Sequence, residues 1–143
     1  MGVRFVLDTA VLVAAIRSDA GASRQLLRLG LLGSYSMLVS VPLIIEYEAV
    51  MTRLEHLTAA RLTEADVGNL LDAILSVAEP VQLDFLWRPA LRDPNDDMVL
   101  EAAINGHADR LVTFNVKDFG GAAEQFGVVA CPPRDAIKLL GDR

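Results

Sequence analysis

Short runs of β-forming apolar residues alternate with longer helical segments along the chain, and this alternation limits the possible fold more than any other feature. Strands are predicted at residues 3–7, 37–41, 81–85, 111–114 and 128–130, and helices at 9–17, 23–32, 42–55, 63–78, 93–105 and 132–140. Such an order indicates an α/β domain with a central, mostly parallel sheet and helices on both faces. Because no linker or internal repeat interrupts the pattern, one domain over residues 1–143 is expected.

Composition excludes several classes of protein. The chain has 143 residues, of which 52% are hydrophobic and 22% charged, so it can build a core without metal or disulfide support. One cysteine and two histidines supply neither a disulfide nor a Cys/His zinc set. A net charge of −6 disfavours wholesale electrostatic binding of nucleic acid but is compatible with a local contact. Since Asp8 interrupts the apolar start of the chain, we expect a cytoplasmic protein that does not enter membranes.

Side chains with oxygen ligands follow the predicted strands. Asp8 comes directly after the first strand, and Asp96 opens the helix that follows the third. Asn115 follows the fourth strand, with Asp118 three residues later. In open parallel sheets the functional crevice lies beyond the carboxyl ends of the strands. These four side chains are therefore expected at one edge of the sheet.

Helical spacing adds a further acid and separates two pairs of neighbours. Glu46 lies about 60° from the centre of an apolar stripe on its predicted helix, whereas Glu48 lies about 120° or more away. In the helix that ends near residue 105, Asp96 shares the apolar face and Asp97 is predicted to be turned aside. The pattern thus predicts three acids, Asp8, Glu46 and Asp96, next to buried faces at the carboxyl edge.

Three carboxylates that converge repel one another unless protons or a cation intervene, and oxygen ligands favour Mg²⁺ or Mn²⁺. Each residue alone also has a structural explanation. Asp8 suits a helix N-cap, Asp96 suits the positive end of a helix dipole, and Glu46 suits a solvated helix flank. Asn115 and Asp118 suit a turn. Their shared edge, rather than any single residue, favours a metal site.

Three segments also resemble blocks of a known family. The segments FVLDTAVLVAA, SVPLIIEYEAV and DPNDDMVLEAAINGHADRLVTFNVKDF are similar to the PIN-domain nucleases, which include the VapC-type toxins of toxin-antitoxin pairs. The resemblance implies a three-layer PIN-like fold over residues 1–143. It also implies catalytic and metal-binding roles, with a hydrogen-bonding role for Thr113; the metal ligands would be Asp8, Glu46, Asp96, Asn115 and Asp118, and the catalytic residues Asp8, Glu46 and Asp96. One departure is Ala10, where the family commonly has Asn.

The function implied by this resemblance is an Mg²⁺- or Mn²⁺-dependent endoribonuclease, the toxin of a pair, with an RNA substrate, a protein antitoxin and a homodimeric assembly. Glu46 is either a metal ligand or the base that accepts a proton from water. Five basic residues near the early helices and the acidic edge could contact RNA phosphates or the acidic groups of a partner, but each alone is better explained as a solvated surface charge: Arg17, Arg24, Arg28, Arg92 and Lys117. The alternatives are a catalytically weak partner-binding module of the same fold and a receiver-type phospho-acceptor domain.

Overall fold

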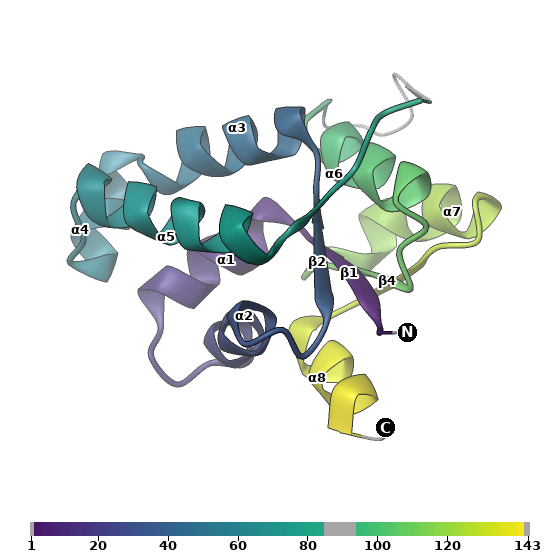
Figure 1. Cartoon of the computed structure of the whole chain (residues 1–143), viewed down its shortest axis with the longest axis horizontal. Coiled ribbons are helices and arrows are strands. Elements are labelled where there is room, and N and C mark those ends of the chain that lie inside the picture. Colours follow the sequence, from purple (N-terminus) through teal and green to yellow (C-terminus); the bar gives the residue numbers. More distant parts are fainter. Residues whose placement is uncertain (1, 85–93, 142–143) are drawn as a thin grey trace.

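The computed structural model describes residues 2–84 and 94–141 and contains a five-stranded parallel sheet in the order β3-β2-β1-β4-β5 (Figure 1). The strands are β1 (Arg4–Leu7), β2 (Ser36–Val39), β3 (Glu79–Pro80), β4 (Arg110–Val112) and β5 (Val129–Cys131). The helices are α1 (Thr9–Arg17), α2 (Ala22–Leu31), α3 (Val41–Met51), α4 (Leu54–Ala60), α5 (Glu64–Val77), α6 (Pro94–Asn105), α7 (Val116–Gln125) and α8 (Pro133–Gly141). The predicted α/β class with a parallel sheet is confirmed.

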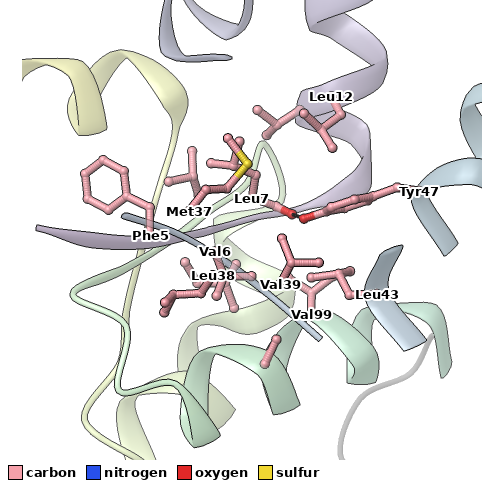
Figure 2. Close-up of a cluster of buried hydrophobic side chains, with 14 of the residues drawn as sticks. Phe5, Val6, Leu7, Leu12, Met37, Leu38, Val39, Leu43, Tyr47 and Val99 are labelled. Carbon is pink, nitrogen blue, oxygen red and sulfur yellow. Dashed lines mark hydrogen bonds between the residues drawn. The ribbon is translucent and has the colours of Figure 1, made fainter. Parts of the chain in front are cut away.

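Side chains of the central strand β1 alternate between two covered faces. Figure 2 shows Phe5 and Leu7 on the same side of the sheet as α1, and Val6 on the side of α6. All three side chains are fully buried. Such burial on both faces is typical of parallel sheets and explains why the β1 sequence is a continuous apolar run rather than an alternating one. In Figure 1, α1 and α2 lie on one side of the strands, and α6 and α7 on the other.

The order of the strands reverses next to β1. From β1 the chain adds β2 and then β3 on one side, whereas β4 and β5 lie on the other. β1 pairs with β4 in the register Val6 with Leu111 and Leu7 with Val112. Helices that leave two neighbouring strands toward opposite faces open a crevice at the carboxyl ends of those strands. The fold therefore places its binding crevice beyond Leu7 and Val112.

Two helices begin where local capping favours them. The Thr63 hydroxyl accepts the Asp66 N–H at 3.1 Å, and the Asp66 carboxylate accepts the Thr63 N–H at 2.9 Å, so α5 begins with the predicted capping pattern. At the start of α3 the Ser40 hydroxyl accepts the Leu43 N–H, and Pro42 lies in the first turn. Among the described helices, none is long and apolar enough to cross a membrane.

The prediction of one helix over residues 42–55 is wrong. α3 ends at Met51, Arg53 is extended, and α4 starts a new direction at Leu54. The Thr52 hydroxyl donates to the carbonyl of Glu48 at 2.7 Å. This type of side-chain bond to the preceding turn competes with helical propagation. The predicted helix is too long because Leu54, which continues the apolar spacing of α3, belongs to α4 instead.

Two other elements differ from the prediction. The strand expected at 81–85 is instead Glu79–Pro80, paired with Leu38 and Val39 of β2, and residue 85 lies outside the described residues. Helix α7 was not predicted, because Gly120 and Gly121 disfavour helix on their own. Its buried side chains, Phe119 and Ala123, are four residues apart and anchor it against the core. Tertiary packing thus overrides local propensity there.

A matched pair of glycines tests the packing. A Cβ on Gly106 would lie 2.8 Å from the Ala102 carbonyl oxygen and 2.9 Å from Leu38 Cδ1, whereas one on Gly68, inside α5, would meet nothing within 4 Å. Gly106→Ala should lower the free energy of unfolding by about 1–3 kcal/mol. Gly68→Ala should raise it by about 0.5–1 kcal/mol, because alanine favours the helix. Urea titration measures both, and equal effects of the two substitutions would contradict the described packing.

Candidate functional site

Asp8 lies at the carboxyl end of β1 and is only 5% exposed. Its N–H donates to the carbonyl of Val112 at 2.8 Å, so the pairing with β4 extends one residue past the end of β1. Asp8 is also the N-cap residue of α1, but its side chain makes no capping hydrogen bond. Asp8 therefore occupies the N-cap position suggested by the sequence, but its carboxylate does not cap the helix.

Thr113 holds that carboxylate from the neighbouring strand. The Thr113 hydroxyl donates to Asp8 Oδ2 at 2.8 Å and accepts the N–H of Asn115 at 3.0 Å. Thr113 is fully buried, and its own N–H donates to Cys131 in β5 at 2.9 Å. One hydroxyl proton and one accepted N–H give the side chain a single orientation. The expected hydrogen-bonding role of Thr113 is confirmed, at the point where the strand order reverses.

Tyr47 connects α3 to the end of β1. Its ring is fully buried, and its hydroxyl donates to the carbonyl of Leu7 at 2.5 Å (Figure 2). Burial raises the pKa of Tyr47 well above its usual value, and the negative charge of Asp8 raises it further. The neighbouring residue Glu46 is half-buried, whereas Glu48 is exposed, as the helical spacing predicts. Residue-level burial thus places Glu46 on the flank of α3 next to the core.

Helix α6 brings Asp96 to the same edge. The Arg4 guanidinium donates to the carbonyl of Gly106, so the carboxyl end of α6 lies beside the start of β1. The helix has twelve residues, about 18 Å of length, and contacts β1 along the sheet. Its first turn, which contains Asp96, therefore lies toward the carboxyl ends of the strands. The Asp96 side chain is half-buried.

The prediction that Asp97 is turned aside is wrong. Asp97 is only 1% exposed, and Glu101, one turn later on the same face, is fully buried. The reason is that α6 packs against α3 and α7 as well as β1, β2 and β4, so its buried arc is wider than one apolar stripe. Sequence reasoning missed Glu101 entirely, although its spacing of four from Asp97 was a usable sign.

Asn115 and Asp118 lie just after β4, at the start of α7, and both are exposed. Asn115 is the N-cap residue but makes no side-chain capping bond, and Asp118 donates its N–H to the Asn115 carbonyl at 3.0 Å. The backbone N–H of Asn115, rather than its amide, contributes to the site through Thr113. The main chain from Asn115 to Asp118 therefore forms the turn that was one explanation of these two residues.

The structure joins Asp8 and Thr113 directly and ties α3 to them through Tyr47. Within residues 2–84 and 94–141, no three His, Cys, Asp or Glu side chains form a group that could hold a metal ion. The five-residue metal set stays a prediction. Cys131 is an unsuitable nucleophile, because burial raises the pKa of its thiol to about 11.

Two of the basic residues have structural partners. The Arg24 guanidinium donates to the carbonyls of Ala15 and Ile16 at 2.5 and 3.4 Å, at the end of α1, and pairs with Asp19 at 3.4 Å. Arg17 lies 3.2 Å from His56 Nδ1. Arg28 and Lys117 are exposed, and Arg92 lies outside the described residues. Arg24 thus stabilises the end of α1, and Arg17 contacts α4 through His56.

Strand order argues against the receiver-type alternative. Receiver domains have the order 2-1-3-4-5, whereas here β2 and β3 lie on one side of β1 and β4 and β5 on the other. Such a domain also needs a phospho-acceptor at the end of a central strand other than the first. In this sheet β3 is a two-residue edge strand.

The fold is similar to that of a chain in a solved crystal structure. The crystal structure of VapBC2 from Rickettsia felis bound to a DNA fragment from their promoter matches with a TM-score of 0.56 and 20% sequence identity. The match covers 89% of this chain and 96% of the other. Among curated proteins, none matches in sequence. The model of the PIN domain family matches residues 4–117, which include Asp8, Glu46, Asp96 and Asn115, and the chain therefore belongs to the PIN-domain family.

Proposed function

We propose that the protein is a cytoplasmic Mg²⁺- or Mn²⁺-dependent endoribonuclease and the toxin of a toxin-antitoxin pair. The observation that carries the proposal is the buried Asp8 carboxylate, held by Thr113 at the reversal of strand order. Ligands of open α/β sheets bind at this point. Membership of the PIN family supports the reaction class, because PIN domains are in general nucleases that use divalent metals.

The donor chemistry of the site suits a hard divalent cation. Asp8 offers a carboxylate, and further carboxylates lie on α3 and α6, so the ligands are all oxygens. Mg²⁺ commonly keeps several waters and uses only one or two protein carboxylates. A direct group of three is therefore not required. We assign Asp8 as the principal ligand, with the remaining direct or water-mediated positions supplied by Glu46, Asp96, Asn115 and Asp118.

A bound divalent cation polarises a phosphate oxygen and lowers the pKa of water near it. In the proposed mechanism the Asp8 carboxylate keeps one orientation, because Thr113 donates to its Oδ2. Glu46 lies on the half-buried flank of α3 and accepts the proton of the attacking water or ligates the ion. Exposed Lys117, in the first turn of α7, contacts phosphate at the rim.

A protein antitoxin is the proposed regulator. This proposal is supported by the fold similarity to a chain of VapBC2 from Rickettsia felis, whose crystal structure is bound to a DNA fragment from their promoter. An acidic toxin of this kind binds RNA only through a local contact, so a partner that covers the crevice is sufficient to inhibit it.

We also propose a homodimer through one apolar surface, the α3–α5 face, formed by the exposed Val41, Ile45 and Leu75 with the groove beside them. Val41 is 70% exposed, Ile45 63% and Leu75 50%. Ile44, Ala78 and Pro80 line the groove between α3, α5 and β3. Contiguous exposed apolar side chains are typical of protein interfaces.

Asp8→Asn tests the proposed nuclease. The substitution keeps an oxygen that accepts the Thr113 hydroxyl bond but removes the negative charge. We expect the variant not to cleave RNA in Mg²⁺ or Mn²⁺. Cells that express the variant should grow, whereas expression of the unmodified protein should arrest growth. At Mn²⁺ 100-fold above Kd, the unmodified protein should gain about 2.7 kcal/mol of stability, and the variant none. Cleavage assays and thermal melts measure these outcomes.

The matched control is Asp19→Asn, at a 97% exposed side chain outside the site. It should retain both cleavage and the Mn²⁺-dependent gain in stability. Normal cleavage by Asp8→Asn would overturn the proposal. So would the absence of metal-dependent cleavage in the unmodified protein, which would leave only a partner-binding module.

Glu46→Gln and Glu48→Gln test the assignment on α3. The two acids are two residues apart, but Glu46 is half-buried and Glu48 exposed. If Glu46 is the base, its substitution should lower kcat by about 10²–10⁴-fold with little change in Mn²⁺ affinity. If it is a ligand, Mn²⁺ affinity falls with kcat. Glu48→Gln should change neither quantity, and equal losses in both variants would contradict the helical placement.

Ile45→Asp tests the homodimer. Placing a charge on the α3–α5 face should convert a dimer into a monomer, because an unpaired carboxylate in an apolar interface is costly. Light scattering coupled to gel filtration measures the mass. Leu54→Asp, at an exposed leucine in the first turn of α4, should leave the dimer intact. A monomeric parent protein, or a dimeric Ile45→Asp variant, would exclude this interface.

A further inference from the structure

We propose that Tyr47 is a positioning residue that orients Asp8 through the backbone, an inference that rests on the proposed metal-dependent nuclease. The Tyr47 hydroxyl, buried on α3, donates to the Leu7 carbonyl. Leu7 precedes Asp8, so the hydroxyl contacts the peptide group that carries the proposed ligand. In this scheme Tyr47 acts on Asp8 through the main chain.

The peptide group between Leu7 and Asp8 is held at both ends. Its carbonyl oxygen accepts the Tyr47 hydroxyl at 2.5 Å, and its N–H donates to the Val112 carbonyl at 2.8 Å. A peptide group is planar, so fixing both polar atoms fixes the plane and the position of the Asp8 Cα from which the side chain projects. With Thr113 bound to Oδ2, three hydrogen bonds from α3, β4 and the end of β4 determine where the Asp8 carboxylate lies.

The hydroxyl of Tyr47 is a permanent donor. A carbonyl oxygen can only accept a hydrogen bond, so the Tyr47 hydroxyl must be the donor of its bond to Leu7. The ring is fully buried on α3, so packing holds the hydroxyl beside the Leu7 carbonyl.

The same bond links the two proposed acids. Glu46 precedes Tyr47 on α3, and Asp8 follows Leu7 on β1, so the hydroxyl-to-carbonyl bond joins residues adjacent to both acids. It therefore sets the separation between the flank of α3 and the end of β1. Side chains that orient ligands in this way typically change metal affinity 10–100-fold when they are lost.

Tyr35 provides a matched control. It is also a buried tyrosine, 4% exposed, and its hydroxyl donates to the Leu26 carbonyl at 2.7 Å. Its partner lies on α2, which contributes none of the proposed ligands. Tyr47→Phe and Tyr35→Phe thus remove the same atom and the same type of bond, and both are expected to lower the melting temperature.

The experiment compares Mn²⁺ binding by calorimetry for the full-length parent protein, both tyrosine variants, and each tyrosine variant combined with Thr113→Val. Tyr47→Phe should weaken Mn²⁺ binding about 10-fold or more, whereas Tyr35→Phe should leave it unchanged. In the double variant Tyr47→Phe/Thr113→Val, the loss of Mn²⁺ affinity should differ from the product of the losses in the two single variants, because the two residues orient one carboxylate. Equal Mn²⁺ affinities for Tyr47→Phe and Tyr35→Phe would overturn the inference.

A second readout needs no metal. Hydrogen exchange of the Asp8 amide, measured by NMR, should accelerate in Tyr47→Phe relative to Tyr35→Phe by more than their difference in global stability explains. If the parent protein binds no Mn²⁺ and cleaves no RNA, the proposed function fails, and this exchange rate alone decides the positioning role. Equal exchange in the two variants would show that Tyr47 is only a core residue.

Discussion

The hydrogen bond between Thr113 and Asp8 is the interaction on which the rest of the site depends. A carboxylate that is nearly excluded from solvent is costly unless hydrogen bonds or a cation compensate its charge. The donor comes from the strand beside β1, so the two strands must pair in a register that puts residues 8 and 113 opposite each other. The reversal of strand order at this point is what leaves room for a ligand above them. Packing, register and chemistry thus meet at one contact.

Local patterns in the sequence were sufficient for the class of the fold and for several elements. The helix at 9–17 has the predicted bounds, and the capping pattern at Thr63 has the predicted hydrogen bonds. The placement of Asp8 directly after a buried strand was predicted, and the difference in burial between Glu46 and Glu48 followed from helical angle alone. These predictions succeed because each depends on residues that are close together in the chain, where helical geometry and capping act directly.

Features decided by distant contacts were not predictable in the same way. The burial of Asp97 follows from neighbours on several sides of α6, and α7 forms despite two glycines because Phe119 reaches the core. Tyr47 was visible only as a member of an apolar stripe. A buried tyrosine must find a partner for its hydroxyl, but which carbonyl it meets depends on how α3 crosses the end of β1. The metal set itself remains a hypothesis about side chains from four elements.

The two-residue strand β3 has a consequence for how the protein avoids uncontrolled self-association. It forms one border of the sheet, and its second residue, Pro80, has no N–H to offer to an incoming strand. A short border that contains proline is a poor template for adding β-structure from another chain, which is a common route to aggregates. Copies of this chain that associate at this end must therefore do so through helical surfaces rather than by extending the sheet.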